Sequence, residues 1–156
     1  MDKACRGLRR RFHVCGKCGQ ENGRKVMSTV LVVDDQQELR QLFAKVLENQ
    51  GHRVLLASNG EEAFQVLGAT IPDLILLDMA MPHMDGMSFL KLMRVRPRWS
   101  RIPVIVLSGL MTPEQRAAAR DLGVTDQLIK AEFSMKELRS RVSKCLAATS
   151  AAATAA

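Results

Sequence analysis

Short, mostly apolar runs recur along this chain, and each run stops at a polar side chain. The runs and the residues that follow them are 29–33 before Asp34 and Asp35, 74–77 before Asp78, 103–107 before Ser108, and the shorter 127–129 before Lys130. Apolar runs without alternation are typical of strands that are buried on both faces, as in parallel sheets. Ligands of open parallel sheets bind outside the carboxyl ends of the strands, so we expect these polar residues to gather there.

Amphipathic segments separate the runs and predict helices between the strands. The first follows Asp35 and has apolar residues on one face: Leu39, Leu42, Phe43, Val46 and Leu47. Three later helices begin with capping signals, at Asn59, Thr112 and Ser134. A further strand is expected at 53–57 and a further helix at about 86–95. The pattern predicts an α/β fold of the flavodoxin-like (βα)₅ type, a doubly wound five-stranded parallel sheet with strand order 2-1-3-4-5.

The chain divides into a folded body and two dissimilar ends. Residues 27–148 carry all five strand–helix units, and the 156 residues suffice for one domain with a core. Residues 1–26 form a basic, Cys-containing extension without helical or strand periodicity, which we expect to be disordered. Residues 149–156 contain only Ala, Thr and Ser, and we expect a disordered tail there.

The net charge of +7 belongs to the extension rather than to the body. Residues 1–26 hold eight Lys or Arg against two acidic residues, whereas the rest holds 15 basic and 14 acidic residues. We therefore do not expect the body to bind nucleic acid on the basis of its average charge. No apolar run approaches the length of a membrane helix and no signal peptide is apparent, so we expect a cytoplasmic protein without membrane contact.

The strand-end residues form a coherent chemical set. Three carboxylates this close need a compensating cation, and oxygen ligands favour Mg²⁺. Ser108 adds a hydroxyl and Lys130 an ammonium, which together with the metal would surround a phosphoryl group with positive charge and hydrogen-bond donors. Each residue alone has an ordinary explanation, such as Asp35 capping a helix, but their joint placement on successive strand ends favours a phosphoryl site.

Residues 78–86 carry the most specific motif. They read Asp-Met-Ala-Met-Pro-His-Met-Asp-Gly and match every fixed position of D-x-x-M-P-x-M-D-G. With Asp34 and Asp35, Ser108 and Lys130, they make the body resemble the CheY-like receiver domain of two-component response regulators. The resemblance covers about 120 of the 156 residues.

The resemblance implies a role for each matching residue. Asp78 would accept a phosphoryl group from a phosphohistidine of a sensor kinase or phosphotransfer protein. Asp35 would bind Mg²⁺ directly and Asp34 mainly through water, with the Ala80 backbone carbonyl as a further ligand. Ser108 and Lys130 would contact the phosphoryl group. Such a receiver catalyses only its own phosphorylation and dephosphorylation, and it signals by binding a downstream protein.

Two positions depart from the family pattern. The family usually has Pro after the lysine, joined by a cis peptide, but Ala131 follows Lys130 here. The family often has an aromatic switch residue three positions before the lysine, but Gln127 stands there and the chain has no Tyr. We therefore expect an intact phosphorylation site with an altered or weaker relay to the output surface.

Two alternatives to a stand-alone receiver stay open. One is a hydrolase or phosphotransferase that acts on an external substrate at the acidic edge, although no inserted substrate loop is visible. The other is a zinc- or nucleic-acid-binding regulator that acts through residues 1–26. Its zinc ligands would be Cys5, His13, Cys15 and Cys18. A single CxxC is only half of the usual zinc signature, which weakens this alternative.

Overall fold

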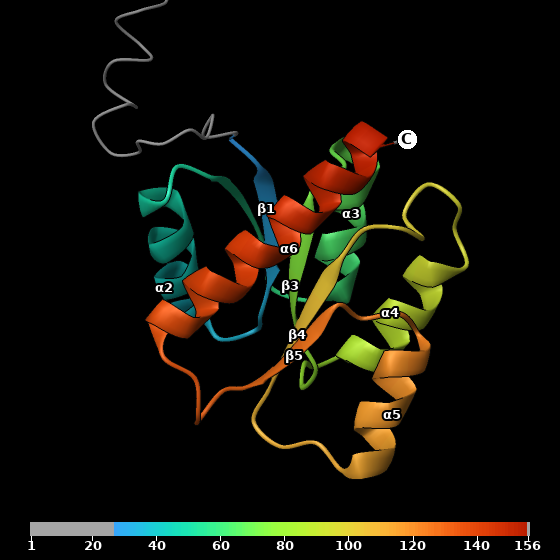
Figure 1. Ribbon diagram of the computed structural model, residues 1–156. Coiled ribbons are helices and arrows are strands. Elements are labelled where there is room, and N and C mark those ends of the chain that lie inside the picture. The colour runs from blue at the N-terminus through green and yellow to red at the C-terminus, as the bar shows by residue number, and fades with distance from the viewer. Residues whose placement is uncertain (1–26, 156) are drawn as a thin grey trace, which may run out of the picture.

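A computed structural model describes residues 27–155, with side chains to residue 150, and it contains the predicted sheet. The strands are β1 (Thr29–Val33), β2 (Arg53–Ala57), β3 (Leu74–Asp78), β4 (Val104–Ser108) and β5 (Asp126–Ile129). They are all parallel and lie in the order β2-β1-β3-β4-β5 (Figure 1). The prediction of a flavodoxin-like (βα)₅ fold is confirmed.

Helices cover both faces of the sheet. They are α2 (Gln37–Asn49), α3 (Gly60–Ala69), α4 (Gly86–Arg94), α5 (Pro113–Asp121) and α6 (Met135–Ala155). Helices α2 and α6 lie over one face, and α3, α4 and α5 lie on the other side (Figure 1). Among the described residues, no helix has both the length and the apolar composition that a membrane span requires.

The core consists of two layers because side chains of a strand alternate between the faces of the sheet. Leu31 and Val33 pack with residues of α3 and α4, whereas Val30 and Val32 pack with residues of α2 and α6. The strand residues of β3 and β4 are all buried. This complete burial explains why these strands appear in the sequence as continuous apolar runs.

The helix starts follow the capping signals in the sequence. Asn59 accepts a hydrogen bond from the Glu62 amide at 2.9 Å, and the Glu62 carboxylate accepts one from the Ser58 amide at 2.6 Å. Thr112 forms a reciprocal capping box with Gln115. Such caps satisfy backbone N–H groups that have no partner within the helix, and they fix where each helix begins.

The last helix is longer than predicted. Helix α6 continues through Ala155, so the prediction of a disordered tail over 149–156 is wrong for residues 149–155. Alanine has the highest intrinsic helix propensity, so an Ala-rich segment can extend a helix that is already nucleated. The predicted disorder of residues 1–26 lies outside the described residues.

Candidate functional site

The carboxyl edge of the sheet holds the buried polar side chains that the sequence predicts. Asp34, Asp78 and Ser108 are 0%, 2% and 3% exposed, whereas Asp35 is exposed. Asp34 follows β1 directly, and Asp78 ends the neighbouring β3. On β4, Leu107 pairs with Asp78, so Ser108 lies one position further along the same edge. The strand register therefore brings together residues that are far apart in sequence.

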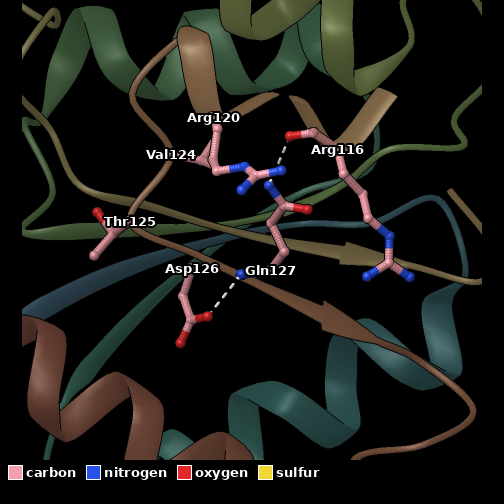
Figure 2. A pocket seen from close by; sticks show the side chains of 6 residues that line it. All are labelled: Arg116, Arg120, Val124, Thr125, Asp126 and Gln127. Atoms are coloured by element: carbon pink, nitrogen blue, oxygen red, sulfur yellow. Dashed lines mark hydrogen bonds between the residues drawn. The ribbon is translucent and has the colours of Figure 1, made fainter. Parts of the chain in front are cut away.

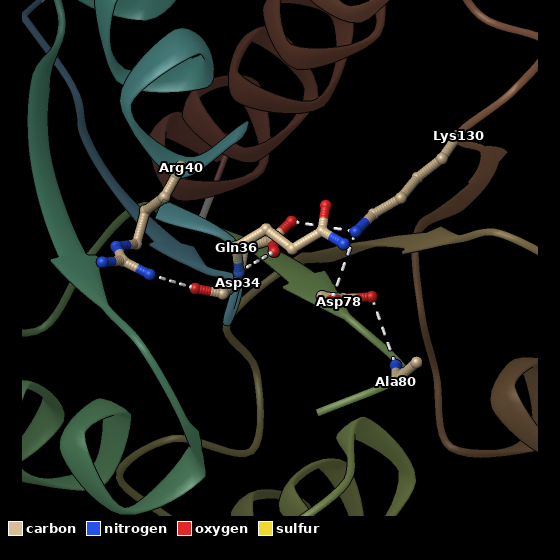
Figure 3. A network of polar contacts seen from close by, with 6 residues as sticks. All are labelled: Asp34, Gln36, Arg40, Asp78, Ala80 and Lys130. Carbon is tan, nitrogen blue, oxygen red and sulfur yellow. Dashed lines mark hydrogen bonds and ion pairs between the residues drawn. The ribbon is translucent and has the colours of Figure 1, made fainter. Parts of the chain in front are cut away.

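Lys130 bridges the two buried carboxylates. Its Nζ lies 3.0 Å from Asp34 Oδ2 and 3.3 Å from Asp78 Oδ2 (Figure 3). Its own backbone N–H donates to the Ser108 carbonyl at 2.7 Å, which holds the lysine at the end of β5. No peptide bond among the described residues is cis, so the Lys130–Ala131 bond is trans, and the ammonium still reaches both aspartates.

Asp34 is held by contacts that the sequence did not predict. Its Oδ1 accepts a hydrogen bond from the Gln36 amide at 2.8 Å, and its carbonyl accepts one from the Arg40 guanidinium (Figure 3). Gln36, rather than Asp35, is the N-cap of α2, and its side chain makes no capping bond. Asp35 is therefore not used as a cap and is exposed at the mouth of the site.

Burial and the ammonium of Lys130 shift the pKa of Asp78 in opposite directions. Burial raises its pKa to about 6, and the nearby Asp34 carboxylate adds to this rise. The Lys130 ammonium opposes the rise, as does the hydrogen bond from the Ala80 amide to Asp78 Oδ1 at 3.2 Å. A carboxylate with a raised pKa gains from any further cation at the site, because the cation favours its ionised form.

Gly86 permits the close approach of the 79–85 loop to the site. A Cβ atom at this position would lie 2.6 Å from the Asp78 carbonyl oxygen and 2.7 Å from Met79 Cα. These are backbone atoms, so a larger residue would displace the end of β3. In this fold, steric exclusion of a Cβ atom therefore explains the Gly at the end of the D-x-x-M-P-x-M-D-G motif. Asp85 precedes it and caps α4 through the Ser88 amide at 2.7 Å.

The carboxylates fit a magnesium ion. One oxygen each from Asp34, Asp35 and Asp78 lies within 4.8 Å of the others, and hard oxygen donors are the ligands that Mg²⁺ prefers. The proposed zinc ligands Cys5, His13, Cys15 and Cys18 lie outside the described residues. Cys145 is in α6 and is buried among apolar side chains, where burial raises the pKa of its thiol.

A cavity of about 410 Å³ opens beside Ala80 and Ser108 at the carboxyl edge of the sheet. Its lining residues come from the loops after β3 and β4: Met79, Ala80, Asp85, Met87, Ser108, Gly109, Leu110, Met111 and Gln115. Leu110 is 89% exposed at its rim. Beside Asp78 there is consequently free space on the side of Ser108 and Ala80.

Gln127 occupies the position at which the family often has an aromatic switch. Its side-chain amide donates to the Arg116 carbonyl of α5 at 3.1 Å, and so it joins β5 to α5 (Figure 2). A polar pocket of about 310 Å³ surrounds it and is lined also by Arg116, Arg120 and Asp126. A side chain bonded to a helix backbone is fixed in place, in contrast to a ring that can swing between two positions.

Comparison with known proteins agrees with the fold. The sequence model of the family described as "Response regulator receiver domain" matches residues 30–143. The chain belongs to this family. Receiver domains are signalling domains rather than conventional enzymes; they bind Mg²⁺ at an acidic pocket and interact with histidine kinases or phosphotransfer proteins and with downstream targets.

Relatives of this receiver include both longer regulators and isolated domains. It is 37% identical over 116 residues to the KDP operon transcriptional regulatory protein KdpE of Escherichia coli. That alignment covers 74% of this chain and 50% of KdpE. The chain is 36% identical over 117 residues to the Regulator of RpoS of the same species, which covers 75% of this chain and 34% of that protein. The chain thus spans between a third and a half of these relatives.

A solved receiver structure shares the fold. The receiver domain of the Francisella response regulator 1452 superposes with a TM-score of 0.72 at 34% sequence identity. The alignment covers 78% of this chain and 98% of that domain. Nearly the whole of an isolated receiver is therefore matched by the folded body of this chain.

Proposed function

We propose that this receiver accepts a phosphoryl group on Asp78 from a phosphohistidine of a sensor kinase or phosphotransfer protein. The observation that carries the proposal is the arrangement of Asp78: it is buried at the end of β3, its carboxylate is paired with Lys130, and it lies beside two further carboxylates. An aspartate in this setting is a competent nucleophile for phosphorus.

Asp34, Asp35 and Asp78, with the Ala80 carbonyl, would hold Mg²⁺. When bound, this ion neutralises charge on the phosphoryl oxygens and on the acidic cluster. Without it, Lys130 is the only cation that forms ion pairs with the carboxylates of Asp34 and Asp78 among the described residues. The lysine alone leaves the three-carboxylate cluster with excess negative charge, which is the electrostatic reason why phosphorylation should depend on a divalent cation.

The transfer needs few groups from the protein. An Asp78 carboxylate oxygen forms a bond to phosphorus while the bond from phosphorus to the donor histidine nitrogen breaks, and that nitrogen keeps the electron pair and takes up a proton. Lys130 is placed to turn its ammonium from Asp34 to a phosphoryl oxygen, because it already lies 3.3 Å from Asp78. Ser108, on the neighbouring strand end, would donate its hydroxyl to another phosphoryl oxygen.

The signal would leave the domain through protein binding, with the surface of α5, β5 and α6 as the output face. The Gln127 bond to α5 supports the expectation of an altered relay, since an amide side chain stands where the family often has an aromatic ring. The domain would act as a phosphorylation-controlled binding module in the cytoplasm. Its own phosphorylation and slow dephosphorylation would be its only catalysis.

The test is phosphorylation by acetyl phosphate with Mg²⁺, followed by intact mass. Wild-type protein should gain one phosphoryl group, Asp78→Asn should gain none, and wild type without Mg²⁺ should gain little. Asp121→Asn, which removes an exposed carboxylate at the end of α5, is the matched control and should be modified normally. Absence of added mass on the wild type, or its persistence in Asp78→Asn, would contradict the proposal.

A further inference from the structure

The cavity at the carboxyl edge of the sheet has a wall that is mostly apolar. Five of its nine lining residues are apolar, and they come from the loop after β3, the start of α4 and the loop after β4: Met79, Ala80, Met87, Leu110 and Met111. With about 410 Å³, the cavity lies within the range of small-molecule pockets, roughly 300–1,000 Å³. An apolar group of a few carbon atoms would therefore fit.

Two of the three polar side chains in this wall are engaged in helix caps. The Asp85 carboxylate accepts the Ser88 amide at 2.7 Å, and the Gln115 side chain accepts the Thr112 amide at 2.9 Å. The Ser108 hydroxyl, in contrast, makes no hydrogen bond to another described residue, although Ser108 is only 3% exposed. Buried hydroxyls normally have a partner, so the cavity offers one donor to a polar atom of a ligand.

The cavity adjoins the aspartate that the proposed function phosphorylates. Ala80 and Ser108 line the cavity, whereas Asp78 does not. The Ala80 amide donates to Asp78 Oδ1 at 3.2 Å, so only this short contact separates the wall from the carboxylate. A phosphoryl group that is bound to Asp78 and contacts Ser108 would stand between the carboxylate and the cavity.

The leaving group of the donor would face this apolar wall. In phosphoryl transfer, the attacking and leaving atoms lie roughly in line on opposite sides of phosphorus. The group that leaves is therefore on the side away from Asp78, where Ala80 and Leu110 have no polar side-chain atoms. Leu110 is 89% exposed at the rim, so a bound apolar chain would cover it. Burial of apolar surface from both partners favours such a chain over water.

The wall also restricts the chemistry of the leaving group. Among the residues that line the cavity, Asp85 is the only titratable one, and its carboxylate caps α4. No lining residue is therefore placed to protonate a leaving oxygen. An alcohol would have to leave as a strongly basic alkoxide, whereas a carboxylic acid leaves as a stable carboxylate. Among phosphates that carry an apolar chain, acyl phosphates are consequently the suitable class.

We propose that the cavity binds the hydrocarbon chain of small acyl phosphates, and that the receiver prefers butyryl phosphate to acetyl phosphate as a phosphoryl donor. This inference rests on the proposed function, because it names a class of donor for the same aspartate. An Asp78 oxygen forms a bond to phosphorus while the bond from phosphorus to the acyl oxygen breaks. The carboxylate departs with the electron pair and needs no proton.

The test compares acetyl, propionyl and butyryl phosphate as donors to the full-length protein with Mg²⁺, followed by intact mass. Their leaving carboxylates have nearly equal basicity, so a difference in rate reports contacts of the chain rather than intrinsic reactivity. The second-order rate constant should rise with chain length and be about threefold to tenfold higher for butyryl than for acetyl phosphate, because two more methylene groups are buried. Phosphoramidate, which has no acyl chain, monitors the phosphorylation site itself.

Two variants place polar atoms in the cavity wall. Leu110→Asn and Met87→Gln should each lower the ratio of the butyryl to the acetyl rate constant to less than about twofold. Leu110 is exposed and Met87 is partly exposed, so neither change disturbs the buried core. The matched control is Val95→Asn, which replaces a 76% exposed apolar residue at the end of α4, outside the cavity. It should keep the wild-type ratio.

The outcomes separate this inference from the phosphorylation of Asp78. Equal rate constants for the three acyl phosphates, or slower reaction with butyryl phosphate, would overturn the inference, while modification by phosphoramidate would leave the role of Asp78 intact. A wild-type ratio in both cavity variants, or an equal loss in Val95→Asn, would also overturn it, since the preference would not arise in the cavity. No added mass from any of the four donors would contradict both proposals.

Discussion

Removing the charge of Asp78 should stabilise the fold while it disables the site. In Asp78→Asn, the side chain keeps its size but no longer carries a buried negative charge beside Asp34. Lys130 retains Asp34 as its partner at 3.0 Å. In Mg²⁺-free buffer at pH 7 we therefore expect the variant to have a higher free energy of unfolding than the wild type.

The magnitude follows from the pKa of Asp78. Its rise from 3.8 to about 6 means that the folded state binds the proton more tightly than the unfolded state does. Stability must then fall as pH rises between these values, by up to about 3 kcal/mol at 1.36 kcal/mol per pKa unit. Allowing for relaxation of the site and penetration of water, we expect about 1–3 kcal/mol of added stability in Asp78→Asn at pH 7.

Urea unfolding from about pH 4 to pH 7 measures this difference. The two proteins should be nearly equal at the acidic limit and diverge toward neutral pH, with the variant more stable. Saturating Mg²⁺ should narrow the gap by stabilising the wild type preferentially. Asp121→Asn should change stability by less than about 0.5 kcal/mol. A less stable Asp78→Asn at pH 7, or a gap independent of pH, would refute the reasoning.

Three further predictions concern the frame of the site. Gly86→Ala should lower the free energy of unfolding by about 1–3 kcal/mol and abolish modification by acetyl phosphate, because its Cβ would meet backbone atoms at 2.6 and 2.7 Å. Gly68→Ala is the control, because a Cβ there has nothing within 4 Å; it should leave stability unchanged or raise it, and it should be modified normally. Arg94→Met should lower the free energy of unfolding, measured in urea, by about 2–4 kcal/mol, because four backbone carbonyls lose their hydrogen-bond donor. A loss of stability no larger than that of Arg116→Met would contradict this. Ala80 offers no polar side chain to position water, so phosphorylated protein followed by intact mass should lose its phosphoryl group slowly, and a half-life of seconds with Mg²⁺ would contradict this expectation.

Much of the site could be predicted because strand ends are visible in sequence. A buried parallel strand appears as an uninterrupted apolar run, and the first polar residue after it marks the edge at which ligands bind. Asp34, Asp78 and Ser108 were found in this way, and Lys130 by its place after the fourth run. The parallel register then fixes their proximity without any knowledge of side-chain packing.

Contacts that use the backbone had no signal in the sequence. Arg40 reaches the carbonyl of Asp34, and the Gln36 amide reaches its carboxylate. Backbone groups are the same at every position, so only the turn between β1 and α2 decides which of them point toward the site. The role of Arg94 could not be predicted from the sequence for the same reason, because its four acceptors are all backbone carbonyls.

The Ala-rich end is helical through Ala155, although its low complexity predicts disorder. Residues 149–155 have little apolar surface to bury, which favours disorder, but they follow a helix already anchored by Leu138 and Val142. Extending an existing helix avoids the cost of nucleation, so the high helix propensity of alanine is enough to keep these residues helical.

The course of α6 has a practical consequence for labelling. This helix begins after the loop that follows Lys130, and its 21 residues span roughly 30 Å toward the end at which β1 starts (Figure 1). A fluorophore or affinity tag attached after α6 would lie far from Asp78 and suits phosphorylation assays.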